Sequence, residues 1–179
     1  MTMNLPNKLT ILRVIMIPFF VFFMLWPVVP YSNIVAVVIF CVASFTDFLD
    51  GYLARRDNLV SNFGKFMDPL ADKLLVGAVL ICLIETEQLP ALVVIIIISR
   101  EFIISGFRLI ASDNGVVIAA SYWGKFKTVS QMAMVIVLIL NIPALALVGQ
   151  ILIWVSTILT VVSLVDYIVK NKDVLKDVK

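Results

Sequence analysis

The sequence predicts an all-α, polytopic membrane protein with six transmembrane helices, formed as a single membrane domain over residues 1–179. Hydrophobic residues make up 62% of the chain and charged residues only 15%, with a mean hydropathy of +1.10. Soluble domains do not usually reach this composition. Long apolar runs recur along the chain, and each is about long enough to cross a hydrocarbon core of ~30 Å.

Turn residues separate these apolar runs into six predicted helical spans. Pro27, Pro30 and Asn33 interrupt the chain after the first run, and Asn141 and Pro143 end the fifth. The predicted spans are 8–26, 34–54, 63–84, 91–111, 123–140 and 144–169. Polar loops are expected at 56–62 and 112–122, and the charged tail after residue 169 is expected to be solvated.

The basic residues orient these spans. The loops at 27–33, 85–90 and 141–143 contain no lysine or arginine. The basic residues of the opposite side are Lys8, Arg13, Arg55, Arg56, Lys65, Arg108, Lys125, Lys127 and the lysines of the tail. The positive-inside rule therefore predicts that both termini are cytoplasmic, and the even number of spans agrees.

The composition also excludes several classes of function. A net charge of +2 gives no argument for nucleic acid binding. The chain has no histidine, so a histidine base or metal ligand is excluded. Cys41 and Cys82 lie in apolar runs without metal-ligand spacing, and we interpret both as small core residues.

Five aspartates lie within residues 47–72, which is unexpected in so apolar a chain. Residues three, four and seven apart share a helix face. Two such faces carry acids interleaved with small residues. The first holds Asp47, Asp50, Gly51 and Ala54, and the second holds Gly64, Asp68 and Asp72. A short loop joins the two spans, so we expect antiparallel neighbours on which four carboxylates converge.

Converging carboxylates need a compensating charge, which hard divalent cations provide. Two metal ions bridged by carboxylates are typical of phosphoryl chemistry. Gly51, Ala54 and Gly64 would let a phosphate-bearing group approach the backbone, and Arg55 can bind phosphate. The alternative is a set of helix caps and loop-end charges that pair with nearby basic residues, Arg55, Arg56, Lys65 and Lys73. The number of acids and their interleaving with small residues favour the metal site.

The segment reads D-x2-D-G-x2-A-R-x8-G-x3-D-x3-D from Asp47 to Asp72. This pattern resembles the signature of the CDP-alcohol phosphotransferase family at all eight fixed positions. The resemblance implies six transmembrane helices and, usually, a homodimer. From the carboxylates we expect magnesium or manganese as cofactor, with two ions per site. The resemblance also implies transfer of a phosphatidyl group from CDP-diacylglycerol, or of a phosphoalcohol from a CDP-alcohol, to an alcohol, with release of CMP.

The resemblance also assigns roles to the residues of the signature. Asp47, Asp50 and Asp68 resemble the metal ligands, and Asp72 resembles the general base and is also close to the metals. The residues expected to bind CDP-diacylglycerol are Asn7, Thr10, Asp50, Gly51, Ala54, Arg55 and Gly64. Asn7 and Thr10 either cap the first span or line the nucleotide site, and the similar opening of the family favours the second.

Three further stretches resemble bacterial phosphatidylglycerophosphate synthases: NLPNKLTILRVIMIPFF, SREFIISGFRL and WGKFKT. The implied acceptor is glycerol 3-phosphate, whose own phosphate needs basic partners. The candidates are Lys65, Arg100, Arg108, Lys125 and Lys127. Two alternatives stay open: Lys125 and Lys127 follow the positive-inside rule or contact lipid headgroups, and Arg100 and Arg108 form an intramembrane ion pair with Glu101.

Other functions remain to be weighed against this one. The same chemistry could serve another acceptor, namely inositol phosphate, serine or phosphatidylglycerol. A divalent-cation transporter would also place carboxylates in the membrane, but these acids cluster near one face and no inverted repeat is evident. A structural or assembly protein would not need four converging acids. We expect a bacterial inner (cytoplasmic) membrane enzyme whose active site faces the cytoplasm and whose partners are CDP-diacylglycerol, glycerol 3-phosphate and membrane lipid.

Overall fold

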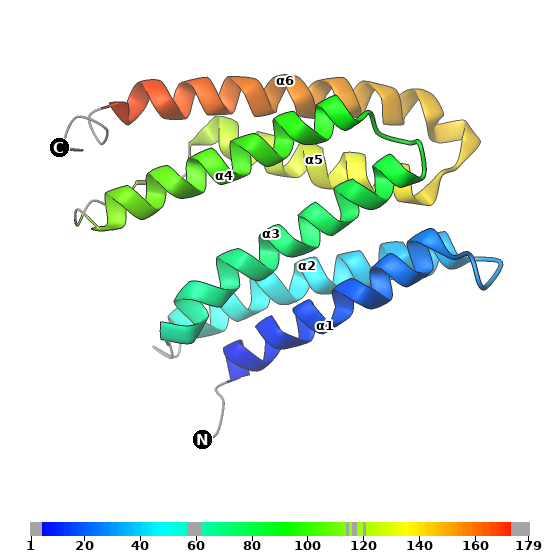
Figure 1. Ribbon diagram of the computed structural model, residues 1–179, viewed down its shortest axis with the longest axis horizontal. Helices are drawn as coiled ribbons and strands as arrows, with labels where there is room; N and C mark the ends of the chain where they lie inside the picture. Colours follow the sequence, from blue (N-terminus) through cyan, green and yellow to red (C-terminus); the bar gives the residue numbers. More distant parts are fainter. Residues whose placement is uncertain (1–4, 57–61, 114, 116–117, 120, 173–179) are drawn as a thin grey trace. The chain divides into compact units, whose positions relative to one another are not determined.

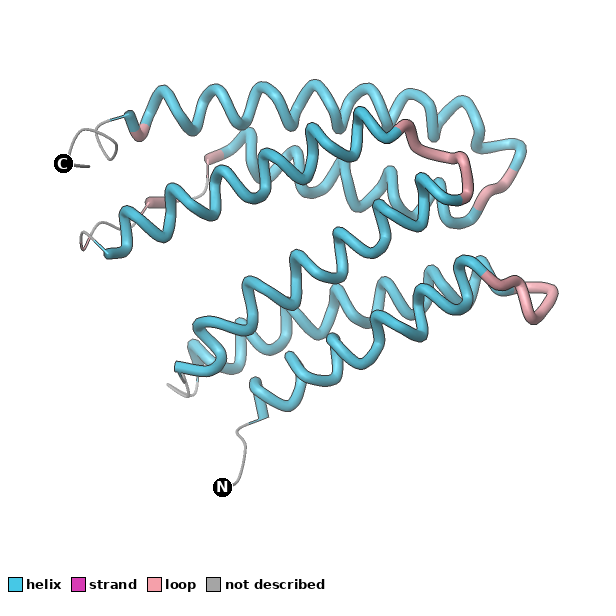
Figure 2. The backbone as a smooth tube through the Cα atoms, in the orientation of Figure 1, coloured by secondary structure: helices cyan, strands magenta, loops and turns pink. Residues whose placement is uncertain are grey.

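The computed structural model describes residues 5–56, 62–113, 115, 118–119 and 121–172, and these fold entirely as helices, turns and connecting segments (Figures 1 and 2). Within the helices, the side chains of residues 6, 48, 50–56, 62–66 and 113 lie outside the description. The predicted all-α class is confirmed over this part of the chain. Each predicted helix end agrees with the structure to within three residues, and the largest difference is the first helix, predicted from Lys8 and found from Leu5.

The chain divides into two compact units, Met1–Gln88 and Leu89–Lys179. The first unit contains α1 (Leu5–Leu25), α2 (Ser32–Arg56) and α3 (Asn62–Glu85). Helix α1 packs along both α2 and α3. Its buried stripe begins with polar residues, Asn7, Thr10 and Arg13, and continues with Phe20 and Met24. The polar end of this stripe positions the candidate site.

Small residues let the helices of the first unit approach closely. Ala36 and Ala43 on α2 and Ala71 on α3 are each 0% exposed. Small side chains at helix contacts are typical of membrane helix packing, where dispersion contacts replace the hydrophobic driving force. Leu75 and Val79 continue the buried face of α3 toward its C-terminal end.

The second unit contains α4 (Ala91–Asp113), α5 (Tyr122–Leu140), the 3-10 helix η1 (Pro143–Leu145) and α6 (Ala146–Lys170). Helix α6 packs against both α4 and α5. The buried residues of α6 recur every three or four positions and are mostly small or hydroxyl-bearing: Gly149, Ile153, Ser156, Thr160, Ser163 and Tyr167.

Capping residues define both ends of α5. At the N-cap, the Ser121 hydroxyl accepts a hydrogen bond from the Gly124 amide at 3.2 Å. At the C-cap, Asn141 adopts the left-handed conformation (φ 48°), which asparagine tolerates better than most residues. Asn141 was predicted to end this helix, and it does so.

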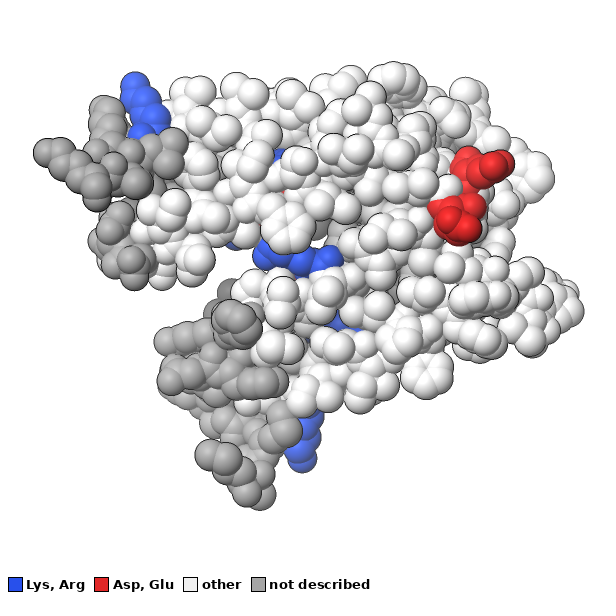
Figure 3. Space-filling model, in the orientation of Figure 1, with Lys and Arg blue, Asp and Glu red and all other residues white. Residues whose placement is uncertain are grey.

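Within the part of the chain that the structure describes, three helical segments are long and apolar enough to cross a membrane: Asn7–Leu25, Tyr122–Leu140 and Pro143–Lys170. Ser32–Asp47 forms a shorter apolar stretch. Much of the described surface in Figure 3 is neither acidic nor basic, and large apolar side chains such as Phe19, Leu147 and Trp154 are exposed. A surface of this kind suits lipid rather than water. The count of six crossings and the cytoplasmic termini remain predictions.

Candidate active site

Arg13 anchors the charged contacts of the first unit. Its side chain is 0% exposed, whereas the side chain of Asp47 on α2 is 43% exposed. Arg13 Nη1 lies 2.7 Å from Asp47 Oδ1, and Arg13 Nε donates to the Ala43 carbonyl oxygen at 3.3 Å. Because a buried guanidinium is costly without a partner, this pair ties the Asp47 carboxylate firmly to α1.

Thr10 makes the equivalent contact with α3. Its hydroxyl donates to Asp68 Oδ1 at 2.6 Å, a distance typical of a hydrogen bond to a charged acceptor. The carboxylates of Asp47 and Asp68 are close enough to interact electrostatically. Helix α1 therefore holds one acid of α2 and one acid of α3 near each other, as the prediction of converging carboxylates requires.

The start of α1 argues against the capping interpretation of its polar residues. The helix begins at Leu5, so Asn7 and Thr10 lie within it rather than at its N-cap. Asn7 is buried one turn before Thr10, on the same stripe. Asp72 lies one turn after Asp68 on α3 and is exposed. Capping therefore does not account for Asn7 and Thr10, and their positions suit residues that line a site.

Several predicted site residues have side chains outside the described part of the structure. They are Asp50, Gly51, Ala54, Arg55, Gly64 and Lys65. Among the side chains that are described, no three acids or cysteines form a group that could hold a metal ion. Because Asp50 is not among them, the four-aspartate metal site remains a prediction.

The described donors nevertheless fit a hard divalent cation. Asp47 and Asp68 contribute carboxylate oxygens from two different helices, which is the ligand type that magnesium and manganese prefer. Each carboxylate is also oriented by a buried group of α1, Arg13 for Asp47 and Thr10 for Asp68. Such outer partners are typical of metal ligands, whose orientation they fix.

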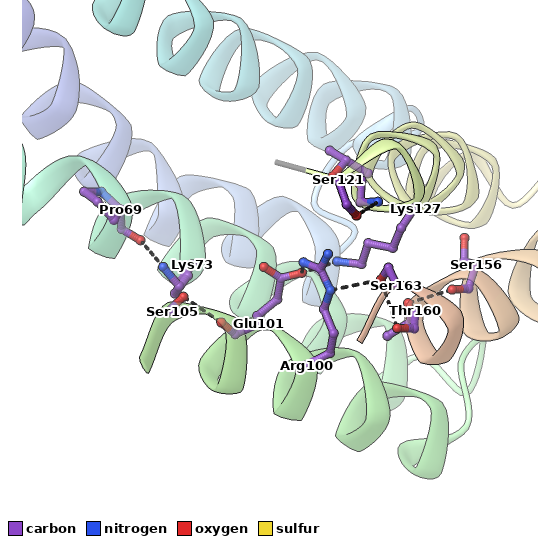
Figure 4. A network of polar contacts seen from close by, with 12 residues as sticks. Pro69, Lys73, Arg100, Glu101, Ser105, Ser121, Lys127, Ser156, Thr160 and Ser163 are labelled. Carbon is purple, nitrogen blue, oxygen red and sulfur yellow. Dashed lines mark hydrogen bonds and ion pairs between the residues drawn. The ribbon is translucent and has the colours of Figure 1, made fainter. Parts of the chain in front are cut away.

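The second unit has its own charged cluster, built from α4 and α5 (Figure 4). Arg100 Nη1 donates to Glu101 Oε1 at 3.1 Å, and Lys127 Nζ forms an ion pair with the same oxygen. The side chain of Lys127 is 3% exposed and that of Arg100 is 10% exposed. Two buried cations therefore share one carboxylate oxygen.

Helix α6 and the first turn of α5 fix the guanidinium of Arg100. Its Nε donates to the Ser163 hydroxyl at 3.2 Å, and Ser163 in turn donates to the Thr160 carbonyl oxygen at 3.0 Å. A side-chain carbon at Gly124 would lie 3.2 Å from Arg100 Nη2. Glycine at this position lets α5 approach the guanidinium closely.

Among the described side chains, the other two predicted acceptor residues of this unit form no hydrogen bond or ion pair with the cluster. Arg108 on α4 is exposed. Lys125 is exposed as well, and its Nζ lies 5.4 Å from the centre of the Tyr122 ring. Lys125 and Lys127 are two residues apart on a helix and therefore face different directions. The structure brings together Arg100 and Lys127, but not Lys125 with them.

Sequence reasoning missed two contributions to these clusters. Arg13 was predicted as a basic residue of the cytoplasmic side, but its pairing with Asp47 was not predicted. Ser163 was not singled out, although Ser156, Thr160 and Ser163 recur at helical spacing in an apolar segment. That recurrence was a usable signal, because polar residues inside membrane helices usually face protein rather than lipid.

The chain belongs to the CDP-alcohol phosphatidyltransferase family, whose sequence profile matches residues 3–162. It is therefore an enzyme of a membrane-associated transferase family, and its apolar helices agree with an integral membrane protein.

Curated relatives extend this similarity to nearly the whole chain. The chain is 44% identical to the CDP-diacylglycerol–glycerol-3-phosphate 3-phosphatidyltransferase of Bacillus subtilis, over 97% of both chains. It is 40% identical to the Haemophilus influenzae protein of the same name, over 99% of this chain and 98% of that one. A Rickettsia bellii protein of that name is also 40% identical, over 92% and 93%.

Proposed function

We propose that this protein transfers the phosphatidyl group of CDP-diacylglycerol to sn-glycerol 3-phosphate, giving phosphatidylglycerol phosphate and CMP. The observation that carries the proposal is the nearly full-length similarity to relatives named for this activity. The two charged clusters support it. One is rich in acids, as a metal-held diphosphate requires, and the other contains two buried cations that suit a second phosphate.

The proposal assigns the donor to the acidic cluster. Asp47, Asp50, Asp68 and Asp72 would hold magnesium or manganese, as two ions. When bound, these ions would neutralise the diphosphate and make CMP a better leaving group. Thr10 and Arg13 keep the carboxylates of Asp68 and Asp47 oriented.

Asp72 is assigned the proton transfer. A hydroxyl oxygen of the acceptor attacks the phosphorus that bears the diacylglycerol, and a new phosphorus–oxygen bond forms. The hydroxyl proton passes to the Asp72 carboxylate, while the phosphorus–oxygen bond to CMP breaks and its electron pair leaves with CMP. The exposure of Asp72, one turn from Asp68, suits this role.

The acceptor is assigned to the basic cluster. The phosphate of glycerol 3-phosphate is an anion that Arg100 and Lys127 can bind, with Ser163 orienting the guanidinium. Arg108, Lys125 and Lys65 remain candidates for a more peripheral role. An acceptor without a phosphate, such as serine, would not need two buried cations.

The proposal also covers the oligomeric state, the membrane and the orientation of the enzyme. We place it as a homodimer in the bacterial cytoplasmic membrane, with the active site on the cytoplasmic side. The distribution of lysine and arginine between the loops supports this orientation.

The test uses the purified full chain in detergent, with CDP-diacylglycerol and magnesium or manganese. CMP release is followed with glycerol 3-phosphate, serine, myo-inositol phosphate or phosphatidylglycerol supplied one at a time, with and without EDTA. We expect release with glycerol 3-phosphate that EDTA abolishes and added metal restores. Release with a different acceptor would overturn the substrate assignment, and no release from folded protein would favour the transporter alternative.

A further inference from the structure

Glu101 lies where an acceptor phosphate would be expected to bind. Its Oε1 receives both Arg100 Nη1 and Lys127 Nζ, the two cations that the proposed function assigns to the acceptor. The carboxylate thus makes the kind of charge-assisted contacts that a phosphate oxygen would make. No role for Glu101 follows from the family signature that ends at Asp72.

The carboxylate of the cluster is more exposed than its two cations. Lys127 is 3% exposed, Arg100 is 10% exposed and Glu101 is 27% exposed. An anion that enters from outside the unit therefore meets Glu101 before it reaches the cations. Among the described side chains of this cluster, the two cations outnumber the one acid, and this balance favours a further anion.

We propose that Glu101 is an internal counter-anion that holds Arg100 and Lys127 in place and is exchanged for the acceptor phosphate when the acceptor binds. This inference rests on the proposed function. Without a phosphate, the carboxylate compensates two cations that are costly to bury alone. When a phosphate arrives, the more exposed Glu101 side chain turns outward, while Ser163 keeps Arg100 oriented.

The exchange also matters for product release. The phosphate of glycerol 3-phosphate is not consumed in the reaction, so the product carries the same group. Any excess affinity for that phosphate would hold the product as firmly as the substrate and would slow turnover. Glu101 competes with both and returns to the cations as the product leaves.

The experiment compares Glu101→Gln with wild-type protein in the CMP-release assay. Glutamine keeps the size of the side chain and an oxygen acceptor but removes the charge. Inorganic phosphate serves as the probe, as a competitive inhibitor against glycerol 3-phosphate. We expect the Ki of phosphate and the KM of glycerol 3-phosphate to fall about fivefold, and kcat to fall as product release slows. The KM of CDP-diacylglycerol is expected to stay unchanged.

Glu85→Gln is the matched control, because it removes one negative charge from an exposed side chain at the end of α3. Glu101→Asp keeps the charge but shortens its reach, and we expect it to lower the Ki of phosphate about twofold. If Glu101→Gln does not fold, the Ki of phosphate for Glu101→Asp tests the inference instead. A Ki that stays the same or rises in the folded variants would overturn the inference.

The proposed function fails in a distinguishable way. If wild-type protein releases no CMP with glycerol 3-phosphate, the acceptor assignment itself is wrong. If wild-type protein is active and inhibited by phosphate, but Glu101→Gln does not bind phosphate more tightly, only the role of Glu101 is wrong.

Discussion

Among the described side chains, the charged clusters of the two units have opposite signs in excess. In the first, one buried arginine, Arg13, faces a group of acids that includes Asp47 and, through Thr10, Asp68. In the second, one carboxylate, Glu101, serves two buried cations. Arg13 orients an acid in the first unit, and Glu101 orients the two cations in the second. The charge in excess is opposite to that of the proposed ligand, divalent metal in the first unit and phosphate in the second.

Removing the proposed base should have the largest effect. We expect Asp72→Asn to lower kcat by about 10²–10⁴-fold, because the acceptor hydroxyl loses its proton acceptor. Binding of CDP-diacylglycerol should be partly retained, as measured by equilibrium binding in detergent. Near-normal turnover would show that Asp72 is not the base.

Breaking the buried ion pair of the first unit should chiefly cost stability. Arg13→Leu leaves Asp47 without its fully buried partner, and we expect a loss of about 2–3 kcal/mol, less than for a fully buried pair because Asp47 is 43% exposed. Chemical unfolding in detergent would measure it. Lys8→Leu, which changes an exposed residue on the same helix, is the control. Equal stability of the two variants would contradict the role of Arg13.

The two lysines of α5 offer a comparison within the second unit. Lys127→Gln removes a buried cation of the cluster, and we expect the KM for glycerol 3-phosphate to rise roughly 10–100-fold, the worth of a charged hydrogen bond. Lys125→Gln changes an exposed residue near Tyr122, and we expect a rise of about twofold. Steady-state kinetics with varied acceptor separates the two. The reverse order would place the phosphate near Lys125 instead.

A smaller effect than that of Lys127→Gln is expected from the hydroxyl that holds Asp68. Thr10→Val keeps the shape of the side chain but removes the 2.6 Å hydrogen bond. We expect the magnesium concentration for half-maximal activity to rise about tenfold, since loss of a group that orients a metal ligand weakens metal binding. Thr157→Val, which removes a hydroxyl bonded only to its own helix at the Ile153 carbonyl, is the control. An unchanged magnesium requirement would separate Thr10 from the metal site.

Much of the fold was predictable from the sequence because its signals are local. The apolar runs and the turn residues between them place every helix end to within three residues. The closeness of the Asp47 and Asp68 carboxylates was also predictable. Helical spacing places each acid on a definite helix face, and a short connection makes the two helices neighbours.

Contacts between segments far apart in the sequence were harder to predict. The pairing of Arg13 with Asp47 spans two helices, and the bond from Arg100 to Ser163 joins residues 63 positions apart. Spacing along one helix does not reveal such partners. The split between Lys125 and Lys127 shows the converse, because nearness in sequence suggested a joint site although a helix turns the two side chains in different directions.

The most direct test of the two-cluster account is the preference for a phosphorylated acceptor. The ratio of kcat/KM for glycerol 3-phosphate to that for glycerol would be measured in wild-type protein and in Lys127→Gln. The account predicts a wild-type ratio of at least about 10³, because glycerol lacks the phosphate that would form charge-assisted hydrogen bonds with Arg100 and Lys127. Lys127→Gln should lower that ratio at least about tenfold. Comparable use of glycerol by the wild type, or a ratio that Lys127→Gln leaves unchanged, would contradict it.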